Sequence, residues 1–350
     1  MYLKDFVDIK MGQSPDSKFY NYDEIGLPFY QGKADFGRIN PTPKIWCSKP
    51  KKEAKPNDIL ISVRAPVGDL NINNEQSCIG RGLAAITCRP DVDMMYVYYY
   101  LKYLKPQLKH ISTGSTFESI NRTQLENLII DYKPYSEQIK ISNILQVVQR
   151  QIEVREKLLR LYDLLIKSRF VELFGDIDCN TKNWPIITLE NLAELITDGE
   201  HSTPKRCNEG IYLLSARNIL NHSLKLDDVD YIDETEYSRI SKRVIPKAGD
   251  ILLSCSGSVG RCCMVPMKIK FQLVRSVALI RFKSEITPIF AEYMITSDWF
   301  QRQINSLKTA SSQANLFQGR IKKLKGFVPD INLQYEFIKV VNQINKLKFA

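Results

Sequence analysis

The side chains best suited to catalysis are few and scattered in this chain of 350 residues. Its three histidines, His110, His201 and His222, have no partner at the spacing of metal ligands. The eight cysteines form no CxxC pair, and the adjacent Cys262 and Cys263 have poor geometry for a disulfide or a zinc site. The sequence therefore predicts no metal site and reduced thiols, as in a cytosolic protein.

Motifs for group transfer and nucleotide binding are also missing from the sequence. It contains neither a Walker A loop nor a GxGxxG motif. The nearest approach to the [DNS]-PP-[FYW] signature of amino-methyltransferases is residues 40–43 (NPTP), which lack the adjacent second proline and the aromatic residue. The segment 256–260 (SGSVG) lacks the full GxSxG pattern of hydrolases and is interpreted as a turn. We therefore expect a protein that recognises a ligand and is not itself a catalyst.

The charge of the chain suits a polyanionic ligand. The net charge is +10 and the pI is about 9.0, with the basic surplus spread along the chain and no basic tail. This distribution is expected of a protein that touches a nucleic acid at several points. A basic protein with no nucleic-acid role would have the same composition, so the charge alone leaves both interpretations open.

Contacts with DNA would need cations and amides against phosphates, and forked donors or amides against base edges. We expect such side chains on loops that follow or precede strands, and a solvated surface charge is the alternative for each of them. Arg81 and Arg275 each precede an apolar strand, so pairing with a carboxylate is a further alternative for these two. The predicted DNA contacts are Gln13, Ser14, Lys18, Lys33, Arg38, Arg64, Arg81, His201, Thr203, Lys205, Arg206, Arg217, Asn218, Arg261 and Arg275.

The elements that must position these residues occur twice along the chain. Residues 55–68 (KPNDILISVRAPVG) match residues 247–260 (KAGDILLSCSGSVG) without a gap. Further pairs follow in the same order: 3–6 with 189–192, 12–15 with 199–204, 26–33 with 210–217, 81–86 with 275–280, 113–115 with 309–311, and 137–141 with 336–340. Matches in one fixed order indicate an internal duplication.

A long apolar periodicity fills the middle of the chain. From residue 135 to 175, apolar residues recur in steps of three and four, which predicts a long helix packed on another helix. Ser136 suits its N-cap and Gly175 its end, and about 38 helical residues would give a rod of ~57 Å. The predicted coiled-coil residues are Ile141, Leu145, Val148, Ile152, Leu159, Tyr162, Ile166, Phe337, Val341 and Ile344.

These patterns predict an α+β protein with a pseudo-twofold internal repeat. Two globular domains with small mixed sheets, residues 1–134 and 176–331, would be separated by long antiparallel coiled-coil helices at 135–175 and 332–350. Strands are expected at 58–62 and 250–254, and helices at 95–105 and 289–304. The second long helix matches only part of the first, which leaves two interpretations: a shortened or truncated subunit, or a partner or second copy that covers the remainder of the first helix.

No run of 18 apolar residues and no basic-then-apolar leader occurs, so we expect neither a membrane span nor a secretory signal but a cytoplasmic protein.

The loops GQSP (12–15) and DGEHSTP (198–204), the DIL[IL]S strands with a following VG turn, and the SEQI start of the central helix form a recognisable set. With the duplication and the chain length, this set resembles the specificity (S) subunit of type I restriction-modification enzymes. The resemblance covers essentially the whole chain.

The resemblance implies a non-catalytic subunit whose two target-recognition domains each read one half of a bipartite DNA site. It implies that the helices dock two modification (methyltransferase) subunits, with restriction (endonuclease and translocase) subunits added outside. It also implies that S-adenosylmethionine, ATP and Mg²⁺ are bound by those partners and not by this chain.

Two other classes of protein share part of this pattern. A non-catalytic coiled-coil adaptor with two protein-binding domains would have the same architecture, and only the basic surplus and the family motifs favour DNA. A stand-alone transcription regulator is disfavoured, because no helix-turn-helix with a basic recognition helix stands out.

Overall fold

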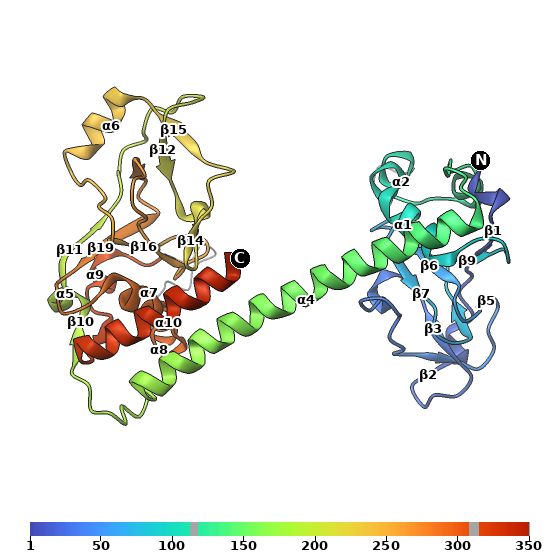
Figure 1. Ribbon diagram of the computed structural model, residues 1–350, viewed down its shortest axis with the longest axis horizontal. Coiled ribbons are helices and arrows are strands. Elements are labelled where there is room, and N and C mark those ends of the chain that lie inside the picture. Colours follow the sequence, from blue (N-terminus) through green and yellow to red (C-terminus); the bar gives the residue numbers. More distant parts are fainter. Residues whose placement is uncertain (113–117, 308–314, 350) are drawn as a thin grey trace. The chain divides into compact units, whose positions relative to one another are not determined.

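The computed structural model describes residues 1–112, 118–307 and 315–349 and divides into two compact units, residues 1–155 and 156–350 (Figure 1). The matched segments 113–115 and 309–311 lie outside the described residues. The predicted domain limits remain predictions. Each unit is described below by itself.

Unit 1 contains two sheets and several short helices. An antiparallel sheet has the order β1-β9-β6-β7, formed by β1 (Val7–Met11), β6 (Ile59–Ser62), β7 (Leu70–Ile72) and β9 (Leu83–Cys88). A mixed sheet has the order β2-β4-β3-β8-β5, formed by β2 (Tyr20–Asn21), β3 (Leu27–Tyr30), β4 (Trp46–Cys47), β5 (Glu53–Ala54) and β8 (Ser77–Ile79). The helices are η1 (Leu3–Asp5), η2 (Ser17–Phe19), η3 (Lys33–Asp35), α1 (Met94–Tyr103), α2 (Lys105–Ile111) and α3 (Arg122–Glu126).

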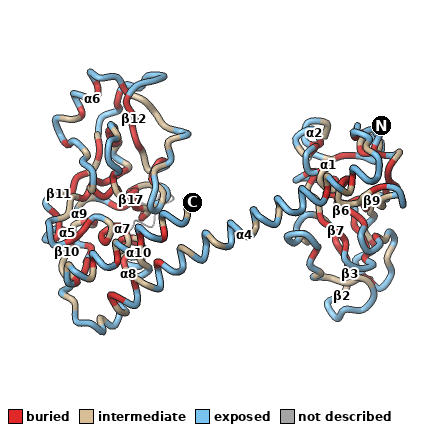
Figure 2. Tube along the Cα trace, viewed as in Figure 1, coloured by how far each residue is buried: buried red, intermediate tan, exposed pale blue. Residues whose placement is uncertain are grey.

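Strand β6 is buried on both faces, which explains its continuous apolar sequence. Ile59 and Ile61 belong to the core that includes Leu101 of α1. Leu60 faces the opposite way and packs in a second cluster with Tyr30 of β3. Because side chains alternate along a strand, one short strand joins the helices to the mixed sheet, and the β6 segment is coloured as buried in Figure 2.

Unit 2 repeats this plan. Its antiparallel sheet has the order β11-β19-β16-β17, formed by β11 (Ala193–Asp198), β16 (Ile251–Ser254), β17 (Cys262–Met264) and β19 (Val277–Phe282). A mixed sheet has the order β15-β12-β18, formed by β12 (Ile211–Leu214), β15 (Asp230–Ile232) and β18 (Phe271–Leu273). Two-stranded pairs join β10 (Ile186–Thr188) to β20 (Lys325–Phe327) and β13 (Ile219–Leu220) to β14 (Ser223–Leu224). The helices are η4 (Ala216–Asn218), α5 (Leu189–Leu192), α6 (Glu234–Ser241), α7 (Pro288–Thr296), α8 (Asp298–Leu307) and α9 (Gln318–Ile321).

The two units match in detail as well as in strand order. In each mixed sheet the first long strand pairs in parallel with the strand before the repeated arginine, β3 with β8 and β12 with β18. Asp58 and Asp250 are both buried, and each accepts a hydrogen bond from its own turn, from Lys55 N (2.7 Å) and Lys247 N (2.8 Å) respectively. The predicted α+β fold and internal duplication are therefore confirmed.

The predicted long helix is α4 (Tyr135–Phe174), and the second is α10 (Ile331–Phe349). Residue Gly175 follows α4 with a φ of +79°, as its role as a helix stop predicts. Within unit 2, Arg169 pairs with Glu336 and Asp163 with Lys348, so the two helices run antiparallel, as predicted.

An aromatic cluster fixes α4 against α10 and α7. The ring centroids of Phe170 and Phe337 lie 5.4 Å apart, and those of Phe174 and Phe290 lie 4.9 Å apart. The predicted coiled-coil residues Ile166, Phe337, Val341 and Ile344 are all buried in this core. These four residues therefore hold α4 to α10 and leave no surface for another subunit.

The remaining predicted coiled-coil residues have different surroundings. Ile141 packs partly buried on the core of unit 1, and Tyr162 packs partly buried on the core of unit 2. Between them, the other four predicted residues are exposed by 37–49%: Leu145, Val148, Ile152 and Leu159.

Two of the predicted helices are each interrupted. The helix expected at 289–304 is divided into α7 and α8, because Ser297 adopts an extended conformation (φ −65°, ψ 150°) and its hydroxyl accepts a hydrogen bond from Phe300 N. The helix expected at 95–105 ends at Tyr103, and α2 then begins at Lys105. An apolar periodicity runs across such a serine cap without revealing it.

Candidate nucleic-acid interface

Loops from four parts of the sequence meet at one edge of the antiparallel sheet in unit 1. Arg81 N donates a hydrogen bond to Ser14 Oγ (3.3 Å), which joins the loop before β9 to the loop after β1. Val63 N donates to Gly82 O (2.9 Å), which adds the loop after β6. A Cβ on Gly82 would lie 2.3 Å from Gln31 O, so the segment after β3 also approaches this edge and requires glycine there.

The same four loops meet in unit 2. Arg275 N donates to Glu200 O (3.0 Å), and Cys255 N donates to Ser276 O (2.8 Å). Ser276 Oγ in turn accepts from Ala216 N of η4 (3.0 Å). Many of the residues predicted from separate motifs are therefore neighbours at equivalent edges of the two units.

The predicted residues of unit 1 at this edge are accessible. Gln13, Arg64 and Arg81 are exposed, and Ser14 is partly exposed. Among the ion pairs of the described residues, none involves Arg64 or Arg81, so the carboxylate pairing considered for Arg81 is not observed. Both guanidinium groups are thus available to a ligand.

Lys33 is exposed but pairs with Asp69 in the loop after β6, at 2.9 Å. Asp69 also accepts a hydrogen bond from Lys105 of α2. Burial raises the pKa of Asp69, but the hydrogen bonds from Lys105 and Lys33 outweigh it and hold the pKa below its ordinary value. To bind a phosphate, the Lys33 amino group would have to break its ion pair with Asp69 or contact Asp69 and the phosphate at the same time.

The other two predictions in unit 1 are surface cations with partners. The amino group of Lys18 lies 5.1 Å from the ring centroid of Phe19, and Lys49 approaches the same ring at 5.1 Å. Arg38 pairs with Glu153 of α4 at 3.0 Å. Sequence reasoning missed Lys49, although it stands in the lysine-rich segment 49–52 (KPKK).

The prediction that Asn218 contacts DNA is wrong. Asn218 is completely buried, and its side chain accepts from Ser215 and donates to the carbonyl oxygens of Lys225 and Asp228. An amide in this position fixes the turn after β12 and has no remaining access to solvent.

The loop with His201 and Thr203 is exposed, as predicted, and a network of charges holds it. His201 Nε2 lies 2.9 Å from Asp198, which also pairs with Arg243 at 2.5 Å. A hydrogen bond from Ser202, followed by the charge of Arg239 on α6, lowers the pKa of Glu200. This part of the surface therefore mixes both signs of charge.

The remaining predicted cations of unit 2 are less free than those of unit 1. Arg206 and Arg217 both bind Asp230, each at 2.9 Å. The predicted contact Lys205 is exposed, and its backbone N–H donates to Glu236. Arg261 is only partly exposed. Asp230 therefore neutralises part of the positive surface that sequence reasoning expected.

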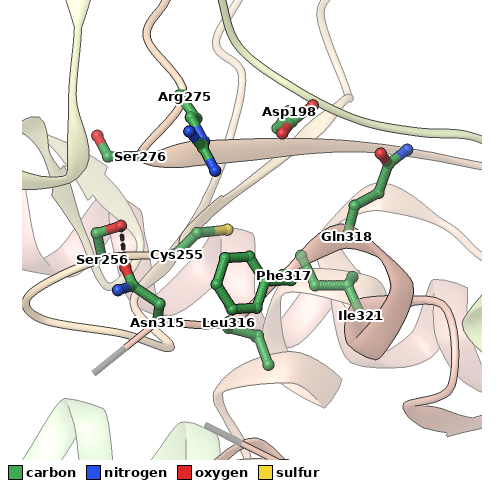
Figure 3. A pocket seen from close by; sticks show the side chains of 10 residues that line it. All are labelled: Asp198, Cys255, Ser256, Arg275, Ser276, Asn315, Leu316, Phe317, Gln318 and Ile321. Atoms are coloured by element: carbon green, nitrogen blue, oxygen red, sulfur yellow. Dashed lines mark hydrogen bonds between the residues drawn. The ribbon is translucent and has the colours of Figure 1, made fainter. Parts of the chain in front are cut away.

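Arg275 lies in a pocket of about 460 Å³ at the edge where the loops of unit 2 meet. Its lining includes Asp198, Ser256, Asn315 and Phe317. Figure 3 shows the Arg275 side chain extending into this space, toward the side occupied by Phe317. Among the described residues, no ion pair to Arg275 is observed, whereas Asp198 is engaged by Arg243 and by the imidazole of His201.

Sequence reasoning missed Asn315, Phe317 and Gln318 in this pocket. The signal was present, because residues 315–320 (NLFQGR) combine an aromatic side chain with two amides and an arginine. Phe317 is 50% exposed, and Ser256 Oγ donates to Asn315 Oδ1 at 2.7 Å.

Two of the cysteines of unit 2, Cys255 and Cys263, are buried thiols. Burial raises the pKa values of the Cys255 and Cys263 thiols to about 12, which keeps both protonated at neutral pH. Within the described ranges, no group of three or more His, Cys, Asp or Glu side chains could hold a metal ion. No helix among these residues has the length and apolar character needed to span a bilayer.

Comparisons with known sequences identify relatives of the chain. Residues 1–160 match the family described as type I restriction modification DNA specificity domain. The putative type I restriction enzyme MjaX specificity subunit of Methanocaldococcus jannaschii is 45% identical over 153 residues, which are 43% of this chain and 36% of that protein. The type I restriction enzyme MjaVIII specificity subunit of the same organism is 22% identical over 279 residues, covering 73% of this chain and 64% of that protein. The chain thus spans less than two thirds of either relative.

Solved structures provide a second comparison. The S subunit of a type I restriction-modification system from M. genitalium aligns with 99% of this chain and 89% of its own, with a TM-score of 0.61 and 17% identity. This match supports the fold described above. The HsdS subunit from Thermoanaerobacter tengcongensis is 47% identical over 44% of this chain and 37% of its own, with a TM-score of 0.41.

Proposed function

We propose that this chain, a relative of the type I restriction-modification specificity subunits, recognises a two-part DNA sequence and reads one half-site with each of its two units. The relationship supplies the class of ligand. The residues of the two sheet edges supply the chemistry.

The observation that carries this proposal is the equivalence of the two loop edges. Each unit presents an arginine, Arg81 or Arg275, next to the loop after its first long strand. A pair of similar edges on one chain is suited to two half-sites at a fixed separation. Different side chains around the shared arginines would allow the two half-sites to differ in sequence.

The charges at these edges match the needs of DNA binding. Arg64, Arg81 and Arg275 are exposed, without an ion-pair partner among the described residues, and offer forked donors to base edges. Lys18 and Lys49 at the Phe19 ring suit phosphate oxygens. Phosphate contacts would orient each unit on the duplex, while the arginines would read the sequence.

The helices supply the surface for protein partners. The exposed apolar residues Leu145, Val148, Ile152 and Leu159 of α4 form a stripe that suits docking of two methyltransferase subunits, with restriction subunits outside them. S-adenosylmethionine, ATP and Mg²⁺ then belong to those partners, and this chain acts without catalytic residues of its own. The assembled complex would work in the cytoplasm, where its DNA target is accessible.

Methylation sequencing tests this function directly. Genomic DNA is compared between cells that contain the methyltransferase partner with this chain and cells that contain the partner alone. We expect a bipartite methylated motif that appears only with the chain. No change in any methylated motif would contradict the proposal.

A matched variant separates DNA reading from protein docking. Ile152→Glu places a charge on the exposed stripe without touching either core, so it should abolish association with the methyltransferase and therefore the methylation. An adaptor with no role in DNA recognition would co-purify with the methyltransferase yet leave the methylated sequence unchanged.

A further inference from the structure

The pocket around Arg275 has a composition that suits a nucleobase. Its floor includes the buried side chains of Leu316 and Ile321, and its rim carries the Arg275 fork and the half-exposed Phe317 ring. Asp198 adds little free negative charge, because His201 and Arg243 both bind it. A planar heterocycle with acceptor atoms on one edge would satisfy the arginine and contact the aromatic ring.

Phe317 occupies a position that its helix does not favour. It is the N-cap residue of α9 and makes no side-chain capping hydrogen bond. Its counterpart in unit 1, Asn121, caps α3 by accepting from Gln124 N at 2.9 Å. N-cap positions favour Asn, Asp, Ser and Thr, so an exposed aromatic residue here gives up helix stability and is better explained by a contact with a ligand.

The equivalence of Phe317 and Asn121 follows from the backbone. Leu316 N donates to Cys255 O at 2.9 Å, and Ile120 N donates to Val63 O at 2.9 Å. Each of these residues directly precedes its N-cap residue, so both segments join the loop after the equivalent strand, β16 or β6.

The equivalent place in unit 1 keeps the arginine and changes its neighbours. Arg81 corresponds to Arg275, as the sequence match and the two loops agree. The bridges Arg64–Ser119 and Ser256–Asn315 make Arg64 the counterpart of Ser256. Unit 1 therefore has a second guanidinium where unit 2 has a hydroxyl, and an amide where unit 2 has an aromatic ring.

Resting on the function proposed above, we propose that Arg275 and Phe317 determine one base of the half-site read by unit 2. Arg275 donates both arms of its fork to O6 and N7 of a guanine, which is the contact that arginine makes best in the major groove. Phe317 packs on the major-groove edge of the adjacent base pair and fixes the position of the duplex at this site. Arg81 has the corresponding role in unit 1, where Arg64 and Asn121 replace the aromatic contact.

The test measures methylated motifs in cells with the partner methyltransferase and each of four variants, Arg275→Lys, Arg275→Ala, Arg81→Lys and Phe317→Asn. Arg275→Lys keeps the charge and removes the fork, so discrimination at one guanine of one half-site should fall roughly 10- to 100-fold, while other positions keep their letters. Arg81→Lys is the matched control and should relax a position in the other half-site only. Phe317→Asn introduces the cap residue of unit 1, so α9 stays folded while selectivity at the guanine or the adjacent base is lost.

Several outcomes would overturn this inference. If the Arg275→Lys chain methylates the wild-type motif with unchanged letters, and Arg275→Ala lowers methylation equally at all sites, the side chain contacts phosphate and does not read a base. If Arg275→Lys alters both half-sites, the pocket does not belong to one half-site. If the wild-type chain itself yields no bipartite motif, the proposed function fails first and this inference fails with it.

Discussion

Gln138 and Gln334 perform the same structural task at the start of the two long helices. Gln138 accepts from Asp93 N, the N-cap of α1, and Gln334 accepts from Thr287 N, the N-cap of α7, each at 2.9 Å. Each amide also donates to a carbonyl five residues earlier in the chain. The sequence match had paired Gln138 with Phe337, so the hydrogen bonds correct the register of the repeat.

This relationship predicts that either glutamine is essential to the stability of its own unit. Gln334 is completely buried and also binds Thr287 Oγ1 and Glu285 O. Gln334→Ala leaves these groups without partners, so the free energy of unfolding of unit 2 should fall by about 2–4 kcal/mol. Gln138→Ala should act in the same direction on unit 1.

Urea unfolding followed for each unit measures the effect. The exposed Gln146 on α4 provides the control, and Gln146→Ala should change the free energy of unfolding by no more than about 0.5 kcal/mol. Equal effects of the buried and exposed substitutions would show that the amide bonds do not matter.

The ion pairs of Asp69 should make the free energy of unfolding of unit 1 depend on pH. Hydrogen bonds from Lys105 and Lys33 hold the Asp69 pKa below its ordinary value, so the folded state favours the carboxylate. The carboxylate of Asp69 therefore stabilises the folded state at pH values above the pKa of an aspartate in the unfolded chain, which is about 4. This stabilisation is lost as the pH falls through the lower pKa that Asp69 has in the folded state. Asp69→Asn should lower the free energy of unfolding by roughly 1–3 kcal/mol at pH 7.

The measurement is urea unfolding of the wild type and the Asp69→Asn variant between pH 7 and pH 3. The difference between them should shrink as the pH falls below about 4. The exposed Asp8 on β1 offers a matched substitution, Asp8→Asn, with little expected effect at pH 7. A difference between wild type and Asp69→Asn that stays constant down to pH 3 would exclude the ion pair as its cause.

The sequence predicts the framework well because burial leaves a clear periodic signal. Strand β6 is buried on both faces, and its apolar run is recognisable and repeated in β16. The long helix α4 shows a clear apolar periodicity over many turns, so it is also recognisable in the sequence. The duplication then carries this information from one unit to the other.

The candidate site is predicted less well, because its residues depend on contacts between distant loops. Arg217 and Asn218 are adjacent in the sequence, yet Asn218 is buried and Arg217 is exposed. Phe317 carries no charge to attract notice and matters only because the chain brings it beside Arg275. Side-chain type alone does not distinguish such residues from ordinary surface groups.

We expect the chain to bind DNA more tightly when the negative charge of Asp230 is removed. It binds Arg206 and Arg217, each at 2.9 Å, and thereby occupies two guanidinium groups on an exposed surface. Asp230→Asn removes the negative charge and releases Arg206 toward phosphate, while Arg217 keeps a second pair with Asp228 at 3.7 Å. We expect tighter non-specific binding and a salt dependence steeper by about one counterion.

Fluorescence anisotropy with a labelled duplex at several salt concentrations measures both quantities. Glu190→Gln is the control, because Glu190 pairs with Lys322 and not with a predicted contact, and its loss should leave the salt slope nearly unchanged. An Asp230→Asn chain with wild-type affinity and slope would mean that Arg206 does not reach DNA.

Helix α4 can be lengthened at the boundary between the two units, between the ion pairs that it forms with each of them. Unit 1 contacts α4 as far as Glu153, through Arg38, and α10 contacts α4 from Asp163 onward. Insertion of seven residues between Arg155 and Glu156, copied from residues 149–155, therefore spares both sets of contacts and keeps the heptad register. Seven helical residues add about 10 Å, or about three base pairs of DNA.

Methylation sequencing with the partner methyltransferase should then show a motif whose gap is longer by about three base pairs and whose half-site letters are unchanged. Arg155→Ala alters the same part of the helix without lengthening it, and should leave both the gap and the letters as in the wild type. Changed letters with an unchanged gap would contradict the role of α4 as a spacer. Loss of methylation with a normally folded chain would instead assign this stretch of α4 to partner docking, which Ile152→Glu tests separately.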